Sequence, residues 1–514
     1  MIGFNNIVNY LKKDKILDWL NQFPDLHNYT KDKSLYYDYI KSCKEQFVES
    51  KISHFKKILS IDSFLPNKSS YLFNQHTYNP NLFIKNVHIK NLKYKLHTRI
   101  DLLIGSNVAR KLFGIKNNKS IYYMVKFVFL KPYFKKSGKL SNNKKLFILK
   151  NRLFFDHMLF TKNNIPVSKN ILVIFKDNSS VKIKIKKNYN KYKKNIISAI
   201  RWNKILNKFG GNWNLKYNYV KYINPNMKNR DDYPWRSAKK QVASIKKEIT
   251  DIWYLNYNDK KRINKKYGVN NWTKLNSKMI IKPTSKVKNI MGIININKLK
   301  SKYSIDSKPK IENSDYEIYI DYETINSLFM ENSFPRQFVF MIGALFMFKD
   351  GDSYKMKFKY YIVDSLKDSE EERIFNDFLF DIRKFNFYNQ KTVNLFHWGQ
   401  IEKYLFDSLN KQYKFNNKID IKFIDINQIF KKHGIFIKGA LNYGLKSIAN
   451  AMYKNYLISN TWDNEMDNGL DAMLEYYNYL KNNKKDDQII RKIVKYNYLD
   501  VKITQEILNW LRNL

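Results

Sequence analysis

Two acidic residues stand two positions apart in the second half of the chain. Asp321 and Glu323 end the strand-like run EIYIDYE, at 317–323. Alternate residues of a β-strand face the same side, so both carboxylates are predicted to point at one place. Hard divalent cations prefer oxygen ligands, which makes the pair a candidate cation site. Taken alone, an Asp-x-Glu pair is also common on ordinary protein surfaces.

Three more residues could join this pair from later in the chain. Glu402 lies where an apolar strand beginning at 394 runs into a helix that opens near Gly399. In the first turn of that helix, the positive end of the helix dipole favours a charged carboxylate. Tyr496 and Asp500 are four residues apart and share one face of the last predicted helix. Each of these features also occurs by itself without any function.

The surrounding elements could bring these residues together. Three strand-like runs follow one another at 317–323, 338–348 and 355–363, and helical segments then alternate with strands from 393 and from 421. Three consecutive strands followed by such alternation predict an α/β domain with a mixed five-stranded sheet and flanking helices. The first strand and the last helix would then carry most of the candidate site.

The order of these motifs resembles that of a known nuclease family. The segments YIDYETI, HWGQIEKYLF and YNYLDV are similar to the motifs of the DEDDy exonucleases of the RNase H-like superfamily, particularly its YprB-type branch. The resemblance implies a 3′→5′ exonuclease in which two Mg²⁺ or Mn²⁺ ions activate water and stabilise the leaving oxygen. The residues it assigns as ion ligands are Asp321, Glu323, Glu402 and Asp500, with Tyr496 orienting the attacking water.

Some details of this resemblance are less regular. Most of the superfamily has Asp where this chain has Glu402. His397, Trp398 and the segment 442–449 are also recognisable in the YprB-type branch. We expect His397 to be a structural histidine whose hydrogen bonds are satisfied at the end of a strand, and not a catalytic residue.

The charge of the chain is concentrated before this region. Residues 1–314 carry 66 Lys and Arg against 18 Asp and Glu, whereas residues 315–514 carry 28 against 27. Lysines and arginines neutralise phosphates and aromatic rings stack on unpaired bases, so the front part is predicted to bind nucleic acid. An A/T-rich coding sequence also favours Lys, Asn, Ile, Tyr and Phe. Such a codon bias does not explain why residues 315–514 lack the excess of positive charge.

Helical and strand-like segments alternate in the front region, at 1–185. A helix is predicted at 35–59, and strands are predicted at 92–103, 121–130 and 171–185. This region resembles a RecB-like nuclease domain of the PD-(D/E)XK class, and the whole chain resembles two-nuclease fusions of bacteria and large DNA viruses. The resemblance matches Glu45 to the helix glutamate of that class, Asp101 to its metal-binding aspartate and Lys126 to its lysine.

Two departures indicate that this front domain does not cleave nucleic acid. The position two residues before Lys126 is Met124, and a thioether cannot replace a carboxylate as a ligand for a hard cation. The following helix has Arg152 where the class usually has Gln. We therefore expect a retained PD-(D/E)XK-like fold at 1–185 that serves as a basic platform.

A basic, helical, tryptophan-rich connector is predicted between the two nuclease-like regions, at 186–312, leaving 313–514 for the exonuclease domain. It opens with a lysine-rich run at 182–198 that is typical of a linker. Residues 248–275 predict helix, turn and helix, a break at Gly268, and another helix. Such a unit can rest on phosphates through helix N-termini, and a structural spacer is an equally good interpretation.

Cysteine content and hydropathy limit the cellular setting. Cys43 is the single cysteine, which excludes an internal disulfide and any multi-cysteine metal site. The N-terminus lacks the pattern of a secretory signal, and the longest apolar run, 338–348, is too short to cross a bilayer as a helix. We expect a soluble, intracellular protein without a membrane partner, in the host cytoplasm or a viral factory if a virus encodes it.

These observations lead to one main hypothesis and two alternatives. The main hypothesis is a metal-dependent exonuclease. Its basic N-terminal part would bind a nucleic-acid strand, most simply a single-stranded 3′ end, and its C-terminal domain would remove nucleotides from that end. The alternatives are a noncatalytic nucleic-acid-binding protein, in which both nuclease folds have decayed, and an endonuclease that uses the front domain. The pattern serves DNA and RNA equally and indicates no protein partner or oligomeric state.

Overall fold

The computed structural model of this chain divides into two compact units. Unit 1 comprises Met1–Lys246 and unit 2 comprises Lys247–Leu514. The structure describes residues 1–60, 78–115, 120–132, 140, 143–185, 189–214, 223–326, 329, 336–351, 353–385, 392–415, 420–462, 469–482 and 487–514. None of the helices in these ranges is long and apolar enough to cross a membrane.

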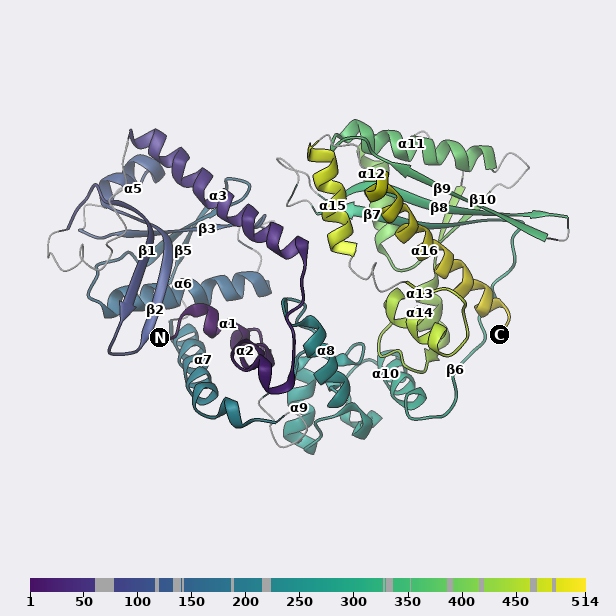
Figure 1. Cartoon of the computed structure of the whole chain (residues 1–514), viewed down its shortest axis with the longest axis horizontal. Helices are drawn as coiled ribbons and strands as arrows, with labels where there is room; N and C mark the ends of the chain where they lie inside the picture. Colours follow the sequence, from purple (N-terminus) through teal and green to yellow (C-terminus); the bar gives the residue numbers. More distant parts are fainter. Residues whose placement is uncertain are drawn as a thin grey trace. The chain divides into compact units, whose positions relative to one another are not determined.

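Unit 1 is built around a five-stranded mixed sheet with strand order β1-β2-β3-β4-β5 (Figure 1). Its strands are β1 (Phe83–Asn91), β2 (Leu96–Ile104), β3 (Tyr123–Val128), β4 (Asn170–Phe175) and β5 (Ser180–Lys184). Its helices are α1 (Val8–Leu11), α2 (Ile16–Gln22), α3 (Leu35–Leu59), α5 (Ser106–Phe113), α6 (Lys144–Lys162), α7 (Tyr189–Phe209) and α8 (Arg236–Ile245). Among these described strands, β3 and β4 run parallel and the other neighbours are antiparallel.

Helices cover both faces of this sheet, as an α/β fold requires. Side chains of α6 and α7 pack with one set of strand residues, and those of α3 and α5 pack with the alternating set. The predicted helix at 35–59 coincides with α3. The prediction of one strand at 171–185 was wrong, because Asn178 adopts a left-handed turn conformation that folds this segment into the hairpin of β4 and β5.

The lysine-rich run predicted as a linker lies within unit 1. It ends β5 and then enters α7, whose Ile196 and Ala199 are fully buried against α6. The α8 helix belongs to this unit as well, since the buried Lys239 ammonium lies 2.9 Å from Asp14 and 2.8 Å from Asp232. The predicted boundary after residue 185 thus falls inside unit 1, and the one after residue 312 falls inside unit 2.

Unit 2 contains the mixed five-stranded sheet that the sequence predicts. Its strand order is β11-β10-β7-β8-β9, with β7 (Tyr316–Ile325) at the centre. The other strands are β8 (Phe338–Asp350), β9 (Ser353–Ile362), β10 (Thr392–His397) and β11 (Asp420–Asp425). The β7, β8 and β9 strands are antiparallel neighbours, whereas β10 runs parallel to both β7 and β11. This is the arrangement of an RNase H-like fold.

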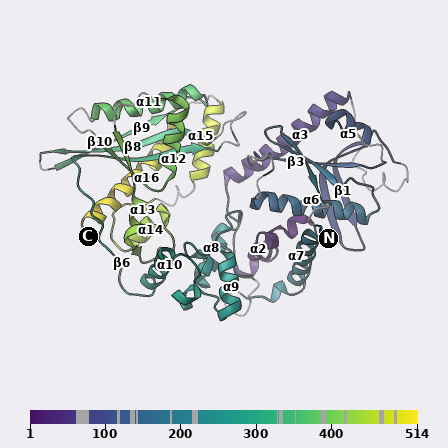
Figure 2. The same ribbon diagram turned by 180° about the vertical axis from the view of Figure 1, so that it is seen from behind.

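Helices from the end of the chain and from its middle cover opposite faces of this sheet (Figures 1 and 2). On one face, Lys359 and Tyr361 of β9 bond Asp381 of α11 (Asp368–Phe385) at 2.6 Å. On the other, Phe358 packs on Tyr498 of α16 (Asp487–Arg512). The remaining helices of this part are α12 (Ile401–Tyr413), α13 (Ile426–His433), α14 (Leu445–Lys454) and α15 (Gly469–Asn482).

The segment before this sheet packs into the same hydrophobic core. It comprises α9 (Tyr257–Tyr267), α10 (Thr284–Ile296) and β6 (Tyr303–Ile305), which pairs with β12 (Ile435–Ile437). Gly268 ends α9 in the left-handed conformation, as predicted, but the flanking segments Ile249–Asp251 and Trp272–Lys274 are single 3₁₀ turns. Their buried residues join those of α13, α14 and α16 in one cluster, so this segment is a brace of unit 2.

Candidate active site

Three of the predicted acidic residues meet between the central strand and the last helix. Asp321 and Glu323 of β7 and Asp500 of α16 each offer a carboxylate oxygen, and these oxygens lie within 4.8 Å of one another. Alternation along β7 puts its two carboxylates on the face that α16 covers. Asp500 is 8% exposed, while the two strand residues are partly exposed. A partly open cluster of hard oxygen ligands fits divalent cations.

An asparagine of α16 fixes the orientation of the strand carboxylates. The Asn497 amide nitrogen donates to Asp321 Oδ2 at 2.9 Å and also hydrogen-bonds Glu323. Asn497 is fully buried and lies against Gly343 of β8, the cross-strand partner of Asp321. A Cβ atom at Gly343 would overlap Asn497 Oδ1. The glycine therefore provides the space in which Asn497 holds the site.

Two aromatic residues border the Asp500 carboxylate. The indole Nε1 of Trp462, which follows α14, donates to Asp500 Oδ1 at 2.7 Å. Tyr496 precedes Asp500 by one turn of α16 and is 9% exposed. The ammonium of Lys446, in the first turn of α14, lies 5.4 Å from the Trp462 ring centroid and 5.2 Å from that of Tyr496.

Glu402 lies beside the three-carboxylate cluster and not within it. Glu402 is 4% exposed and lies in the first turn of α12, as predicted, and its charge still acts on Asp321 and Asp500. Glu402 Oε2 is 3.3 Å from Nδ1 of the buried His397, at the end of β10. Over the described ranges, neither Glu402 Oε2 nor either ring nitrogen of His397 has a hydrogen-bond partner. The hydrogen bonds expected for His397 are thus not found within these ranges, and its assignment as a structural, noncatalytic histidine stays a prediction.

Burial and mutual repulsion hold protons on this cluster. Burial, followed by repulsion from Asp500, Glu323 and Glu402, raises the pKa of Asp321 well above its usual value. Burial raises the pKa of Glu323 to about 7, and burial with repulsion from Glu323 raises that of Asp500 to about 8. Hydrogen bonds from Asn497 and Trp462 and the Lys446 charge oppose these shifts. Cations that bind here would favour the ionised carboxylates.

The residues predicted for a front-half site have a different environment. Asp101 Oδ1 accepts a hydrogen bond from the Lys126 ammonium at 2.7 Å, and Asp101 Oδ2 accepts one from the Phe127 amide at 2.8 Å. Glu45 is exposed on α3, and no hydrogen bond or ion pair between described residues links it to Asp101 or Lys126. The structure thus joins two of the three predicted residues, and it ties both oxygens of Asp101 to the protein.

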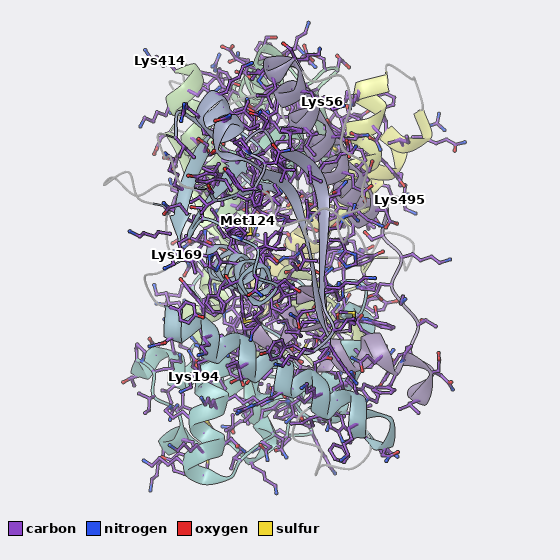
Figure 3. All side chains as sticks on the ribbon, turned by 90° about the vertical axis from the view of Figure 1, so that its left-hand side faces the viewer. Lys56, Met124, Lys169, Lys194, Lys414 and Lys495 are labelled. Atoms are coloured by element: carbon purple, nitrogen blue, oxygen red, sulfur yellow. The ribbon has the colours of Figure 1, made fainter. Side chains whose placement is uncertain are left out.

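The two departures from the PD-(D/E)XK pattern also have structural roles. Met124 is 2% exposed and packs in the core beneath α6. Met124 is thus buried, whereas Lys169 and Lys194, labelled with it in Figure 3, are exposed. The Arg152 guanidinium bonds Asp156 at 3.0 and 3.1 Å and donates to the Arg99 carbonyl oxygen at 2.8 Å. Both residues therefore stabilise the fold.

Sequence reasoning missed Asn497, Trp462 and Lys446 as parts of the site. Asn497 was detectable, because it lies one residue from Tyr496 and three from Asp500 within YNYLD. Lys446 lies in the segment 442–449, which resembles the YprB-type branch, but nothing local relates it to the carboxylates. Trp462 offers no such signal, since an indole near a carboxylate is recognised only after folding.

One comparison with known families bears on this site. Residues 318–512 match the family model described as RNase_H superfamily. No curated protein matches the chain. The match spans the sheet from β7 onward and every carboxylate of the candidate site. Together with the acidic cluster, it indicates that this part of the chain is an RNase H-like, metal-dependent nuclease domain that acts on nucleic acid.

Proposed function

We propose that this chain is a 3′→5′ exonuclease that removes nucleotides one at a time from a single strand of DNA or RNA. The observation that carries the proposal is the convergence of Asp321, Glu323 and Asp500 within 4.8 Å, with Tyr496 one helical turn away. Together with Glu402, these are the residues for which the sequence resembles the YprB-type DEDDy branch. The four carboxylates would hold two Mg²⁺ or Mn²⁺ ions.

The reaction is hydrolysis of the last phosphodiester bond. A water oxygen attacks the phosphorus, the bond from phosphorus to the 3′ oxygen of the penultimate nucleotide breaks, and that oxygen takes up a proton. The products are a 5′-mononucleotide and a strand shortened by one residue. The ions, when bound, activate the water and stabilise the leaving oxygen. In this proposal Tyr496 would orient the water, and Asn497 would keep Asp321 and Glu323 directed toward the ions.

Unit 1 is proposed to bind the substrate without cleaving it. Lys126 and the Phe127 amide already occupy both oxygens of Asp101, and Met124 lies in the core. The RecB-like fold is therefore proposed to be retained as a basic surface for the phosphate backbone. Residues 1–246 carry 50 Lys and Arg against 13 Asp and Glu, and this excess of positive charge supports that role.

The test is degradation of oligonucleotides labelled at the 5′ end, with Mn²⁺ present. We expect a ladder of products that shorten from the 3′ end, and no cleavage of circular single-stranded DNA, because an exonuclease cannot start on a circle. Cleavage of the circle would point to an endonuclease. Binding without shortening of any DNA or RNA oligonucleotide would point to a noncatalytic protein and would overturn the proposal.

A further inference from the structure

Lys446 stands at the acidic cluster without belonging to the carboxylate motifs. Its ammonium lies 5.4 Å from the ring centroid of Trp462 and 5.2 Å from that of Tyr496, and at such distances aromatic faces attract a cation. Trp462 is hydrogen-bonded to Asp500, and Tyr496 is one turn before it. The two rings therefore hold a positive charge next to the place where the scissile bond would be hydrolysed.

The loop before α14 is fastened so that Lys446 keeps this place. The Tyr443 carbonyl accepts a hydrogen bond from Trp398 Nε1 at 3.1 Å, and the Tyr443 hydroxyl bonds Asn289 of α10 at 3.2 Å. The Trp253 amide donates to the Leu441 carbonyl at 3.0 Å. The bracing segment before the sheet thus fixes the start of the helix that carries Lys446.

The Lys446 charge is felt by the site. It lowers the pKa of Glu323 and of Asp500, against the burial that raises both. The Lys446 charge therefore acts at the place where an anionic substrate would bind. A phosphodiester that approaches several carboxylates meets repulsion, and a lysine at the same place offsets it as a compact point charge.

We propose that the Lys446 ammonium contacts a non-bridging oxygen of the scissile phosphate and stabilises the negative charge that develops there during hydrolysis. This role rests on the proposed exonuclease function. Lys446 would then be a catalytic residue of the substrate-bound site, and not a support for the metal ions. The two roles predict opposite effects of its removal on ion binding.

The test compares Lys446→Met, which keeps the length of the side chain and removes its charge, with Lys454→Met at the exposed end of the same helix. Mn²⁺ binding is measured by calorimetry without nucleic acid, and cleavage is measured in single turnovers of bound single-stranded oligonucleotide. We expect Lys446→Met to bind Mn²⁺ as tightly as the wild type or more tightly, yet to cleave roughly 10²–10³-fold more slowly. Lys454→Met should match the wild type in both.

A second measurement reports the contact without any cleavage. With Ca²⁺ in place of Mn²⁺, the affinity for an oligonucleotide is compared with that for one whose last linkage is an uncharged methylphosphonate. The wild type should prefer the charged linkage, and Lys446→Met should lose most of that preference. An unchanged preference, or weaker Mn²⁺ binding in Lys446→Met, would overturn the proposal. A wild type that never cleaves would refute the exonuclease function, while this comparison would still test the contact.

Discussion

An aspartate on a strand of each sheet has very different partners in the two units of this protein. In unit 1, Asp101 is satisfied by a lysine ammonium and a backbone amide. In unit 2, Asp321 receives one amide from Asn497 and otherwise faces Asp500, Glu323 and Glu402. A paired carboxylate stabilises its own fold, whereas crowded carboxylates destabilise theirs until cations arrive. The partners of an acidic residue therefore distinguish a structural site from a metal site.

The largest difference in nuclease rate is expected between two variants, each of which replaces the aspartate of one site by asparagine. Asp321→Asn should lower the nuclease rate by at least roughly 10³-fold, because bound ions supply several kcal/mol of stabilisation and each ~1.4 kcal/mol is tenfold. Asp101→Asn should leave the rate unchanged. Both rates are measured on the same labelled oligonucleotide, with binding measured alongside. Loss of activity in Asp101→Asn alone would move the chemistry to unit 1.

A smaller effect is expected from Gly343→Ala, which changes no charged residue. The new methyl group would overlap Asn497 Oδ1, so Asn497 must leave its position and Asp321 loses its hydrogen bond. We expect about 1–3 kcal/mol lower stability from overpacking, together with a substantial drop in the rate of cleavage. The control is Gly211→Ala, where an added Cβ lies 3.7 Å from the nearest atom, in Phe23. Equal effects of the two variants would contradict the role of Asn497.

The pH dependence of stability should also reveal the crowded site. Unfolded carboxyls ionise near pH 4, whereas Glu323 and Asp500 keep their protons to about pH 7 and 8. Between these values the folded state binds more protons than the unfolded state, so this site lowers stability as pH rises. Added Mn²⁺ should therefore raise Tm more at pH 8 than at pH 6. Asp321→Asn should reduce that difference.

The smallest change is expected from Lys126→Met, which breaks the ion pair in unit 1. Asp101 would lose its ammonium partner at a largely buried position, which costs about 1–3 kcal/mol of stability. Nuclease activity at saturating substrate should be unaffected. Urea unfolding of this variant is compared with that of Lys111→Met, an exposed lysine of α5. Equal stability of both variants would show that the pair in unit 1 is not structural.

Much of unit 2 could be predicted because its signals are local. The strand-like runs of β7, β8 and β9 follow one another along the sequence, and period-two alternation alone places Asp321 and Glu323 on one face. Helical period likewise pairs Tyr496 with Asp500. In unit 1, the turn at Asp177 and Asn178 was overlooked, although both residue types favour turns. A turn predicted at these two residues would have divided the segment 171–185 into the two strands β4 and β5.

The rest of the site depends on contacts between elements far apart in sequence. Gly343 matters because Asn497, from the last helix of the chain, occupies the space above it. Trp462 reaches Asp500, and Lys446 reaches the rings of Trp462 and Tyr496, because α14 packs against α16. The position of the bracing segment follows from a shared core and from the pairing of β6 with β12. The hydrophobic periodicity of one segment carries no information about such contacts with distant segments.

We propose that the acidic cluster of unit 2, and not the paired aspartate of unit 1, binds the catalytic ions. Anomalous diffraction from crystals grown with Mn²⁺ distinguishes the two sites. We predict anomalous peaks among the carboxylates of Asp321, Glu323 and Asp500, and none at Asp101. A peak at Asp101, or crystals with saturating Mn²⁺ and no peak at the three-carboxylate cluster, would show that this assignment of the ion site is wrong.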